Sequence, residues 1–301
     1  MKKNIIYIIN LFFVIIIIFS GCTANEYWYF SCLKLSDNNG IGNCTIAIID
    51  TGINDQYLSE HRENITNTYN VLNNSNDVSD QHGHGTEMVS ILLGDEESNL
   101  VGINPNASII IVKAIGESGK TDNSNIAKAI DFLLNQDELP DIINLSLGSL
   151  NNDPSLEKMI SLALEKGIII VASVGDYSQK DILYPSAYVG VISVQSIDVN
   201  GNLDYMSNTS AKTTLSFPGV GINVLHFENQ EREIKQIQGS SAATILASGY
   251  FSLFLANCQN KGIDITNQEF YQYLTSCIND NKVLNYKEFI DINNFMELYD
   301  E

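Results

Sequence analysis

The stretch IAIID at residues 46–50 decides the fold of this chain, because a short apolar run leads directly into a single carboxylate. A continuous apolar run rich in β-branched residues is typical of a strand that is buried on both faces. Similar runs recur along the chain at Ile109–Val112, Ile142–Leu145, Ile168–Val171 and Val191–Val194. Their repetition predicts a sheet of buried central strands.

Helical patterns lie between several of these runs. Apolar side chains recur at helical spacing around residues 126–134 and again around residues 156–163. The second pattern follows Asp153-Pro154 and is followed by Gly167, which is the expected punctuation of a helix. Alternating strands and helices predict an α/β fold with a parallel sheet. Ligands of such sheets bind beyond the carboxyl ends of the strands, where Asp50 is expected to lie.

Asp50 is followed at long range by two further motifs, HGHGT at residues 82–86 and GSSAAT at residues 239–244. An Asp, a His and a Ser in this order form one of the known chain orders of a Ser-His-Asp triad. A Ser hydroxyl needs a base to remove its proton, so His84 is the candidate base and Ser241 the candidate nucleophile. Asp50 would orient the imidazole and stabilise its charged form. Taken singly, each residue fits a turn, a loop or a helix cap, and the flanking residues favour the triad.

These motifs resemble those of the subtilisin-like serine proteases, and the resemblance covers roughly residues 40 to 295. GSSAAT is similar to the family's Gly-Thr-Ser-Met-Ala-Thr. Three further stretches resemble landmarks of the family: Ser146-Leu147-Gly148, Tyr184-Pro185-Ser186 and Phe217-Pro218-Gly219. The resemblance implies a three-layer sandwich with a mainly parallel sheet flanked by helices. It also implies a serine endopeptidase that forms an acyl-enzyme at Ser241.

The resemblance further implies where a peptide substrate lies. An extended peptide would be added as a strand between residues 146–148 on one side and residues 117–120 on the other. The expected substrate-binding residues are Ser146, Leu147, Gly148, Gly119 and Gly175. His82 lacks the Gly-Thr that follows the family's catalytic His, and we expect it to be exposed near the cleft.

The position of the family's oxyanion-stabilising Asn is occupied by Asp176. Loss of this donor in a member of the family is known to cost roughly 10²–10³ in rate. An ionised Asp would repel the oxyanion, whereas a protonated Asp could donate a hydrogen bond to it. The alternative function is therefore a catalytically impaired pseudoenzyme that binds peptides. Two smaller departures are Ala242 in place of Met and Ile245 in place of Pro.

The first residues read as an export signal. Lys2 and Lys3 precede an apolar run, Ile5–Phe19, that is short for a membrane span. Its end, FSGC at residues 19–22, resembles a bacterial lipobox and implies cleavage before Cys22 and lipidation of its thiol. An uncleaved anchor helix is the alternative, and both place the domain on the extracytoplasmic face of the cell membrane. The expected divisions are a signal peptide at 1–21, an N-terminal anchor segment at 22–39 and a peptidase domain at 40–301.

The charge of the chain bears on its partners. A formal net charge of −20 disfavours binding to nucleic acid and to anionic lipid. We expect a peptide or protein substrate, attachment to the membrane through Cys22 alone, and a monomer. The stretch between Cys22 and Asp50 is short for the family's usual folding propeptide, so we expect the protein to be made without one.

The cysteines and acidic loops bear on disulfides and metals. An extracytoplasmic location permits disulfides, and the four cysteines after Cys22 allow three connectivities. Cys32–Cys44 with Cys258–Cys277 is the local choice, and the alternative for Cys44 is a buried, unpaired thiol. Cysteine and histidine spacing suggests no metal, so we expect no cofactor. The one alternative is calcium at residues 94–99, a loop in the position of the family's calcium loop that is about one residue short.

Overall fold

The central sheet has eight strands, and every pairing between its neighbours is parallel. The computed structural model describes residues 27–33, 44–211, 213–229, 231–263, 265–276 and 284–285. Across the sheet the strand order is β12-β9-β8-β7-β6-β1-β5-β2. The strands are β1 (Thr45–Asp50), β2 (Ile65–Asn70), β5 (Ser108–Lys113), β6 (Ile142–Leu145), β7 (Ile169–Ser173), β8 (Ile192–Ile197), β9 (Leu215–Pro218) and β12 (Leu284–Asn285).

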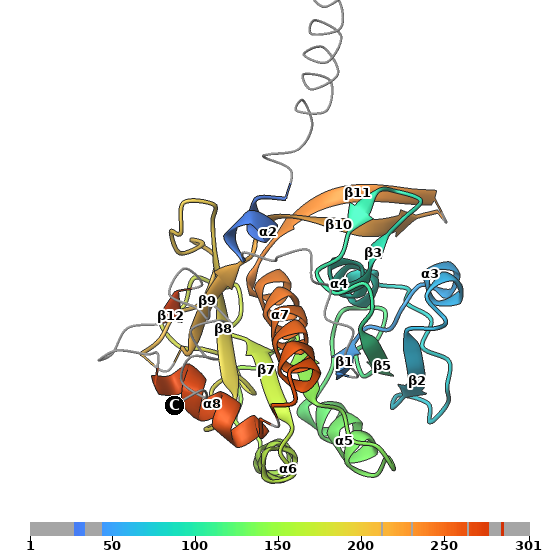
Figure 1. The fold of residues 1–301 in the computed structure, drawn as a ribbon. Coiled ribbons are helices and arrows are strands. Elements are labelled where there is room, and N and C mark those ends of the chain that lie inside the picture. Colours follow the sequence, from blue (N-terminus) through green and yellow to red (C-terminus); the bar gives the residue numbers. More distant parts are fainter. Residues whose placement is uncertain are drawn as a thin grey trace, which may run out of the picture.

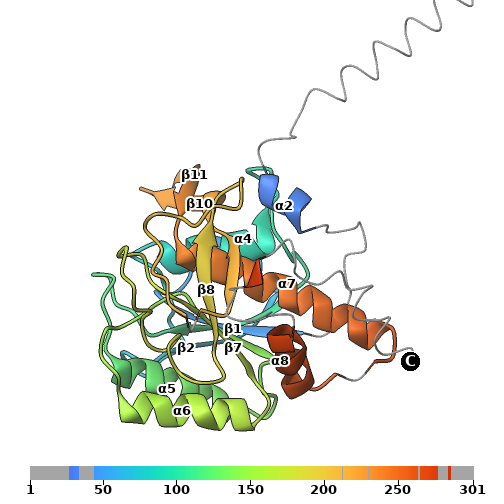
Figure 2. The same cartoon turned by 90° about the vertical axis from the view of Figure 1, so that its left-hand side faces the viewer.

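Helices cover both faces of this sheet (Figure 2). One layer contains α5 (Asn123–Leu134) and α6 (Pro154–Glu165), and the opposite layer contains α4 (His84–Leu93) and α7 (Ser240–Asn260). Strand β1 shows how the sequence builds two cores. Ala47 and Ile49 pack among the residues of α5 and α6, while Ile46 and Ile48 pack among those of α4 and α7. The predicted α/β sandwich of three layers is confirmed.

Smaller elements surround these layers (Figure 1). A two-stranded ribbon and a short hairpin lie beyond α4 and α7, and short helices flank the sheet. These elements are α2 (Trp28–Cys32), α3 (Asp55–Glu60), β3 (Gly94–Asp95), β4 (Leu100–Val101), β10 (Val220–Glu228), β11 (Glu231–Gln238) and α8 (Asn267–Ser276).

The predicted punctuation of α6 is confirmed. The Asp153 side chain accepts hydrogen bonds from the backbone N–H groups of Ser155 and Leu156, and Pro154 occupies the first turn. Gly167 follows the helix with φ +83°, a left-handed conformation that favours glycine. Helix α7 has the length and apolarity of a membrane span, but 83% of its most apolar window is buried within the protein. It is the central core helix among the elements that the structure describes.

The N-terminal segment is described only in part. Residues 1–21 and Cys22, predicted to form the signal peptide and the lipidation site, lie outside the described residues. Within the predicted anchor segment, α2 docks on the ribbon, and Trp28 Nε1 donates a hydrogen bond to the Val220 carbonyl at 3.1 Å. Cys44 and Cys258 have free, buried thiols, so neither local disulfide forms at these two positions.

Candidate active site

The three candidate triad residues come from the ends of three elements that meet at one edge of the sheet. Asp50 is the last residue of β1, His84 is the first residue of α4, and Ser241 lies in the first turn of α7. Parallel strands end at the same edge, and helices on that face begin there, so residues far apart in sequence converge. The structure brings Asp50 and His84 into direct contact.

The Asp50–His84 pair is hydrogen-bonded and buried on the carboxylate side. His84 Nδ1 lies 2.7 Å from Asp50 Oδ1, and Asp50 is only 1% exposed. The backbone N–H of Thr51 donates to the same oxygen at 2.7 Å. Burial by itself lowers the pKa of His84, but the Asp50 carboxylate outweighs burial and raises the pKa to about 9. The imidazole is therefore held by its Nδ1 side, with its other nitrogen available for proton transfer.

Close backbone approach explains why each motif contains glycine. At Gly85, a Cβ atom would lie 2.2 Å from the Gly52 carbonyl oxygen. At Gly52, where φ is +115°, a Cβ atom would lie 2.1 Å from the Val78 carbonyl oxygen. Thr51 completes the contact, because its Oγ1 accepts a hydrogen bond from the Gly85 N–H at 2.8 Å. The flanks of Asp50 and His84 thus pack against each other and fix the distance between the two side chains.

Asp80 shapes the loop that leads to His84, and sequence reasoning missed it. Its Oδ1 accepts from the backbone N–H groups of His82 and Gly83 at 3.0 and 2.8 Å. Its Oδ2 accepts from the N–H and the hydroxyl of Thr86 at 3.0 and 2.7 Å. Burial opposes ionisation of Asp80, but these donors prevail and lower its pKa. The available signal was an Asp just before the first turn of a helix, where carboxylates satisfy free N–H groups.

Ser241 is tied to the predicted substrate strand in this structure. Its Oγ donates to the Ser146 carbonyl at 3.2 Å, and Ser146 Oγ donates to the Ser241 carbonyl at 3.1 Å. Among the described residues, Ser241 makes no hydrogen bond to His84. Such bonds are commonly long in free enzymes and tighten when substrate binds. The N-terminus of α7 directs free N–H groups and a partial positive charge toward the same place.

Asp176 lies in the loop after β7 and contacts Ser240, the residue before the candidate nucleophile. Ser240 donates from its backbone N–H to Asp176 Oδ1 at 2.8 Å and from its hydroxyl to Oδ2 at 3.0 Å. Burial raises the pKa of Asp176, and the two bonds from Ser240 oppose this only in part. The carboxylate adjoins the start of α7 but is directed at Ser240. A side chain at Gly239 would crowd it, because a Cβ atom there would lie 2.9 Å from Oδ2.

The glycines predicted to contact substrate lie where side chains would not fit. A Cβ atom at Gly148 would lie 2.7 Å from Leu183, and one at Gly175 would lie 2.6 Å from the same side chain. A Cβ atom at Gly119 would lie 2.5 Å from His82 Nε2. His82 is exposed, as predicted, and its ring centre lies 6.3 Å from that of His84. Gly119 and Gly148 thus each lie directly against a neighbouring side chain, His82 and Leu183 respectively.

Comparison with known proteins identifies the fold and the motifs together. Residues 42–287 match the model of the subtilase family, Peptidase S8. The chain belongs to the subtilase family. Among its relatives, the thermostable alkaline protease of Halalkalibacterium halodurans is 29% identical over 72% of this chain and 58% of that protein. The minor extracellular protease Epr of Bacillus subtilis is 31% identical over 70% of this chain and 32% of that protein. The chain therefore spans about three-fifths and one-third of these two relatives.

Solved structures agree on the fold. The protease domain of PatA superposes with a TM-score of 0.71 at 20% identity, covering 86% of this chain and 97% of that one. The prenylagaramide maturation protease PagA superposes with a TM-score of 0.70 at 25% identity, covering 87% and 92%. These matches show that the subtilase sheet and its flanking helices are present nearly in full.

A second histidine–carboxylate pair lies beside the candidate triad of this subtilase. Glu87, one helical turn after His84, accepts a hydrogen bond at Oε1 from His226 Nδ1 on β10, over 2.7 Å. The Glu87 carboxylate also contributes to the raised pKa of His84. Sequence reasoning missed this pair because its members are 139 residues apart and neither has a flanking motif.

The acidic loop considered for calcium contacts an arginine. Arg232 on β11 pairs with Asp95 at 2.7 Å and Glu97 at 3.2 Å, and also contacts Glu60. Arg232 and Asp95 are nearly buried, with side chains 10% and 3% exposed. No group of three or more metal-ligating side chains occurs among the residues that the structure describes.

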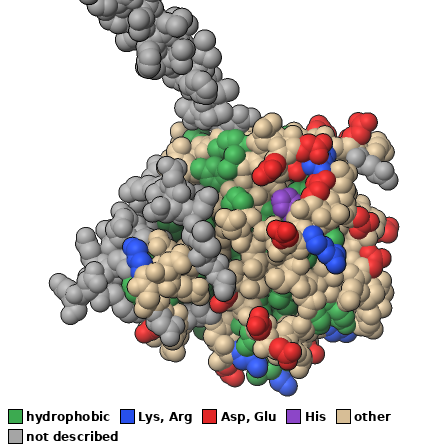
Figure 3. Space-filling view, turned by 45° about the vertical axis from the view of Figure 1, so that its right-hand side comes forward, with side chains coloured by type: hydrophobic (Ala, Val, Ile, Leu, Met, Phe, Trp, Pro, Cys, Tyr) green, Lys and Arg blue, Asp and Glu red, His purple; other side chains and the backbone are tan. Residues whose placement is uncertain are grey.

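On the face shown in Figure 3, basic side chains form no continuous patch among the described residues.

Proposed function

We propose that this subtilase is a serine endopeptidase that hydrolyses peptide bonds through an acyl-enzyme at Ser241. The observation that carries the proposal is the hydrogen-bonded Asp50–His84 pair beside Ser241 at the N-terminus of α7. Family membership supports the same activity. The test is hydrolysis of a peptide by the purified protein. Loss of hydrolysis in both Ser241→Ala and His84→Ala is expected, and hydrolysis that survives in Ser241→Ala contradicts the proposal.

The mechanism follows from the direction of each group. His84 takes the proton of Ser241 Oγ as the oxygen attacks the scissile carbonyl carbon, and later gives that proton to the leaving amine. The Asp50 carboxylate holds Nδ1 and stabilises the imidazolium that forms. The Ser241 N–H and the positive end of α7 stabilise the developing oxyanion. Water then attacks the ester carbon of the acyl-enzyme, with His84 again as base, and frees Ser241.

The substrate would lie as an extended strand in this mechanism. Residues 146–148 are supported as one partner strand because Ser146 is bonded directly to Ser241. Residues 117–120 lie against the His82 loop and offer the other. Added strands bind chiefly through backbone hydrogen bonds, so pockets between them set sequence preference.

We further propose that the protein is anchored by lipid on the extracytoplasmic face of the membrane. The FSGC sequence at residues 19–22 supports this, and Cys22 is five residues before Tyr27, where the described helix region begins. Stable anchoring needs at least two acyl chains. Detergent, and not salt, should then release the protein. Unchanged mass and processing in Cys22→Ala would contradict the anchor.

We propose processing of one exported peptide, such as a leader, as the role of this peptidase. The support is similarity to PagA, which is named a maturation protease. Comparison of secreted peptides from cells with and without Ser241→Ala tests this role. Accumulation of one uncut precursor is expected, and a broad change across many peptides contradicts it.

The presence of Asp176 supports a second candidate function, peptide binding by a catalytically impaired protein. An ionised carboxylate beside Ser241 would disfavour the oxyanion, and both Asp176 oxygens are engaged by Ser240. Binding and cleavage separate the two functions. A protein that binds peptides but gives no acyl-enzyme at any pH would be the impaired form.

A further inference from the structure

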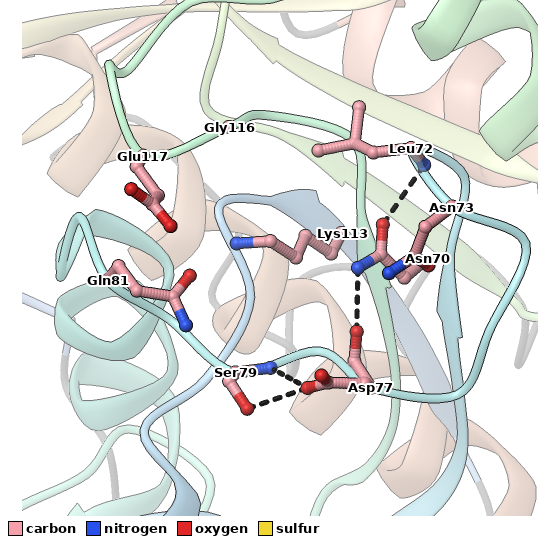
Figure 4. A pocket seen from close by; sticks show the side chains of 9 residues that line it. All are labelled: Asn70, Leu72, Asn73, Asp77, Ser79, Gln81, Lys113, Gly116 and Glu117. Carbon is pink, nitrogen blue, oxygen red and sulfur yellow. Dashed lines mark hydrogen bonds between the residues drawn. The ribbon is translucent and has the colours of Figure 1, made fainter.

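A polar pocket of about 280 Å³ lies beside the triad without including any triad residue (Figure 4). It opens between the loop after β2 and the residues that follow β5. One contact and one sequence neighbour place it next to Asp50 and His84. The ammonium of Lys113 donates a hydrogen bond to the carbonyl of Thr51, which follows Asp50. Gln81, on another wall, is three residues before His84.

Lys113 supplies a buried cation with unused donors. The residue is 5% exposed, and among the described residues its Nζ makes the single hydrogen bond to Thr51 and no ion pair within 4 Å. Burial lowers the pKa of Lys113, while the carboxylates of Asp80 and Glu117 oppose that shift. An ammonium has three donors, and unsatisfied buried donors are costly. A bound acceptor would therefore be stabilised at this point of the pocket.

The other groups of the pocket differ in how far they are already engaged. Asn70 Nδ2 donates to the Asp77 carbonyl at 2.7 Å, and Asp77 Oδ1 accepts from the N–H and hydroxyl of Ser79. Glu117 and Gln81 are exposed and make no hydrogen bond to another side chain or backbone group that the structure describes. Figure 4 shows the Glu117 carboxylate and the Gln81 amide on the same side as the Lys113 ammonium. The groups that remain free therefore include the Lys113 ammonium, the Glu117 carboxylate, the Gln81 amide and Asp77 Oδ2.

We propose that this pocket binds the carboxamide of a glutamine or asparagine side chain of the substrate, on the acyl side of the scissile bond. The amide oxygen accepts from Lys113, and the amide NH₂ donates to Glu117. A carboxylate side chain would be attracted by Lys113 but repelled by Glu117, and an ammonium would meet the reverse. Glu117 also begins the stretch expected to pair with the substrate backbone, so the pocket adjoins the expected path of that strand. The inference rests on the proposed peptidase activity and not on the membrane anchor.

The test is a peptide series in which Gln, Glu, Lys or Ala is placed in turn at each position before a fixed scissile bond. kcat/KM is measured for the wild type, for Glu117→Gln and for the matched control Glu165→Gln, an exposed residue at the end of α6. At one position the wild type should prefer Gln over Glu and Lys by about tenfold, since hydrogen bonds to charged groups discriminate on this scale. Glu117→Gln should raise cleavage of the Glu peptide to at least that of the Gln peptide, and Glu165→Gln should behave as wild type.

Two readouts separate the pocket from the peptidase activity. The wild type and each variant are first labelled with a fluorophosphonate. A wild-type protein that fails to label refutes the proposed activity itself, and only variants that label report on the pocket. In a labelling-competent protein, Lys113→Met should remove the Gln preference. The carboxamide inference is overturned if no position prefers Gln, if Lys is preferred there, or if Glu117→Gln leaves the preference unchanged.

Discussion

Replacement of Asp176 by Asn tests the residue that stands at the position of the family's oxyanion-stabilising Asn. Asp176 Oδ1 already accepts the Ser240 N–H, and an Asn oxygen can keep that bond. The amide nitrogen then takes the place of Oδ2, next to the Ser240 hydroxyl, which can turn and accept from it. A neutral donor thereby replaces a carboxylate oxygen beside the start of α7. The variant should fold and should stabilise the oxyanion better than an ionised Asp.

The magnitude follows from the value of one oxyanion donor, about 10²–10³ in kcat. We predict a gain of up to about 10²-fold, the lower end, because the new donor is shared with Ser240. Burial raises the pKa of Asp176, so the gain should be full above this raised pKa and should shrink toward acid pH, where Asp176 is protonated and can donate itself.

The assay is a pH–rate profile of both proteins on one peptide, with Asp131→Asn, an exposed change on α5, as control. Thermal unfolding gives a second readout. When folding raises the pKa of a carboxyl group, the folding stability of the protein falls as the pH rises from the ordinary pKa of that group through the raised pKa. Asp176→Asn should therefore not lower Tm at neutral pH. An unchanged kcat profile with only a higher KM would refute the oxyanion reasoning and point to a role in binding substrate.

Three further predictions concern His84, Arg232 and Gly85. Because Asp50 raises the pKa of His84 to about 9, kcat/KM should reach half its maximum at a pH well above the ordinary histidine pKa of about 6.5. A half-maximum at the ordinary value contradicts this. Arg232→Ala should lower the free energy of unfolding by about 3 kcal/mol, measured by denaturant titration, because it leaves the buried Asp95 carboxylate unpaired. A chelator should leave the Tm of the wild type unchanged in calorimetry. Gly85→Ala should abolish labelling and lower Tm, because its Cβ would meet backbone at 2.2 Å, whereas Gly116→Ala, with no atom within 4 Å of the new Cβ, should keep wild-type Tm.

The sequence was sufficient for the fold because each central strand carries its own signal. Ile46–Ile49 became the core of β1, and the Asp153-Pro154 start and Gly167 end of α6 were both found where the pattern placed them. Local chemistry determines these features, so a single sequence reveals them.

Apart from the local contacts of Asp80, the unpredicted contacts join residues that are far apart in the chain. Glu87 and His226 meet only because the β10–β11 ribbon packs on α4, and no local pattern encodes that packing. The partners of Arg232 likewise come from α3 and the β3–β4 hairpin. The direction of the Asp176 carboxylate toward Ser240 depends on side-chain rotamers, which motif spacing does not specify.

The central claim is that Ser241 is a nucleophile activated by His84 and Asp50. The most direct measurement is labelling of the purified protein with a fluorophosphonate, followed by intact mass and peptide mapping. The account predicts one adduct per chain, on Ser241, which is lost in Ser241→Ala and nearly lost in His84→Ala. An adduct on another residue, labelling that persists in Ser241→Ala, or a wild-type protein that never labels would contradict the account.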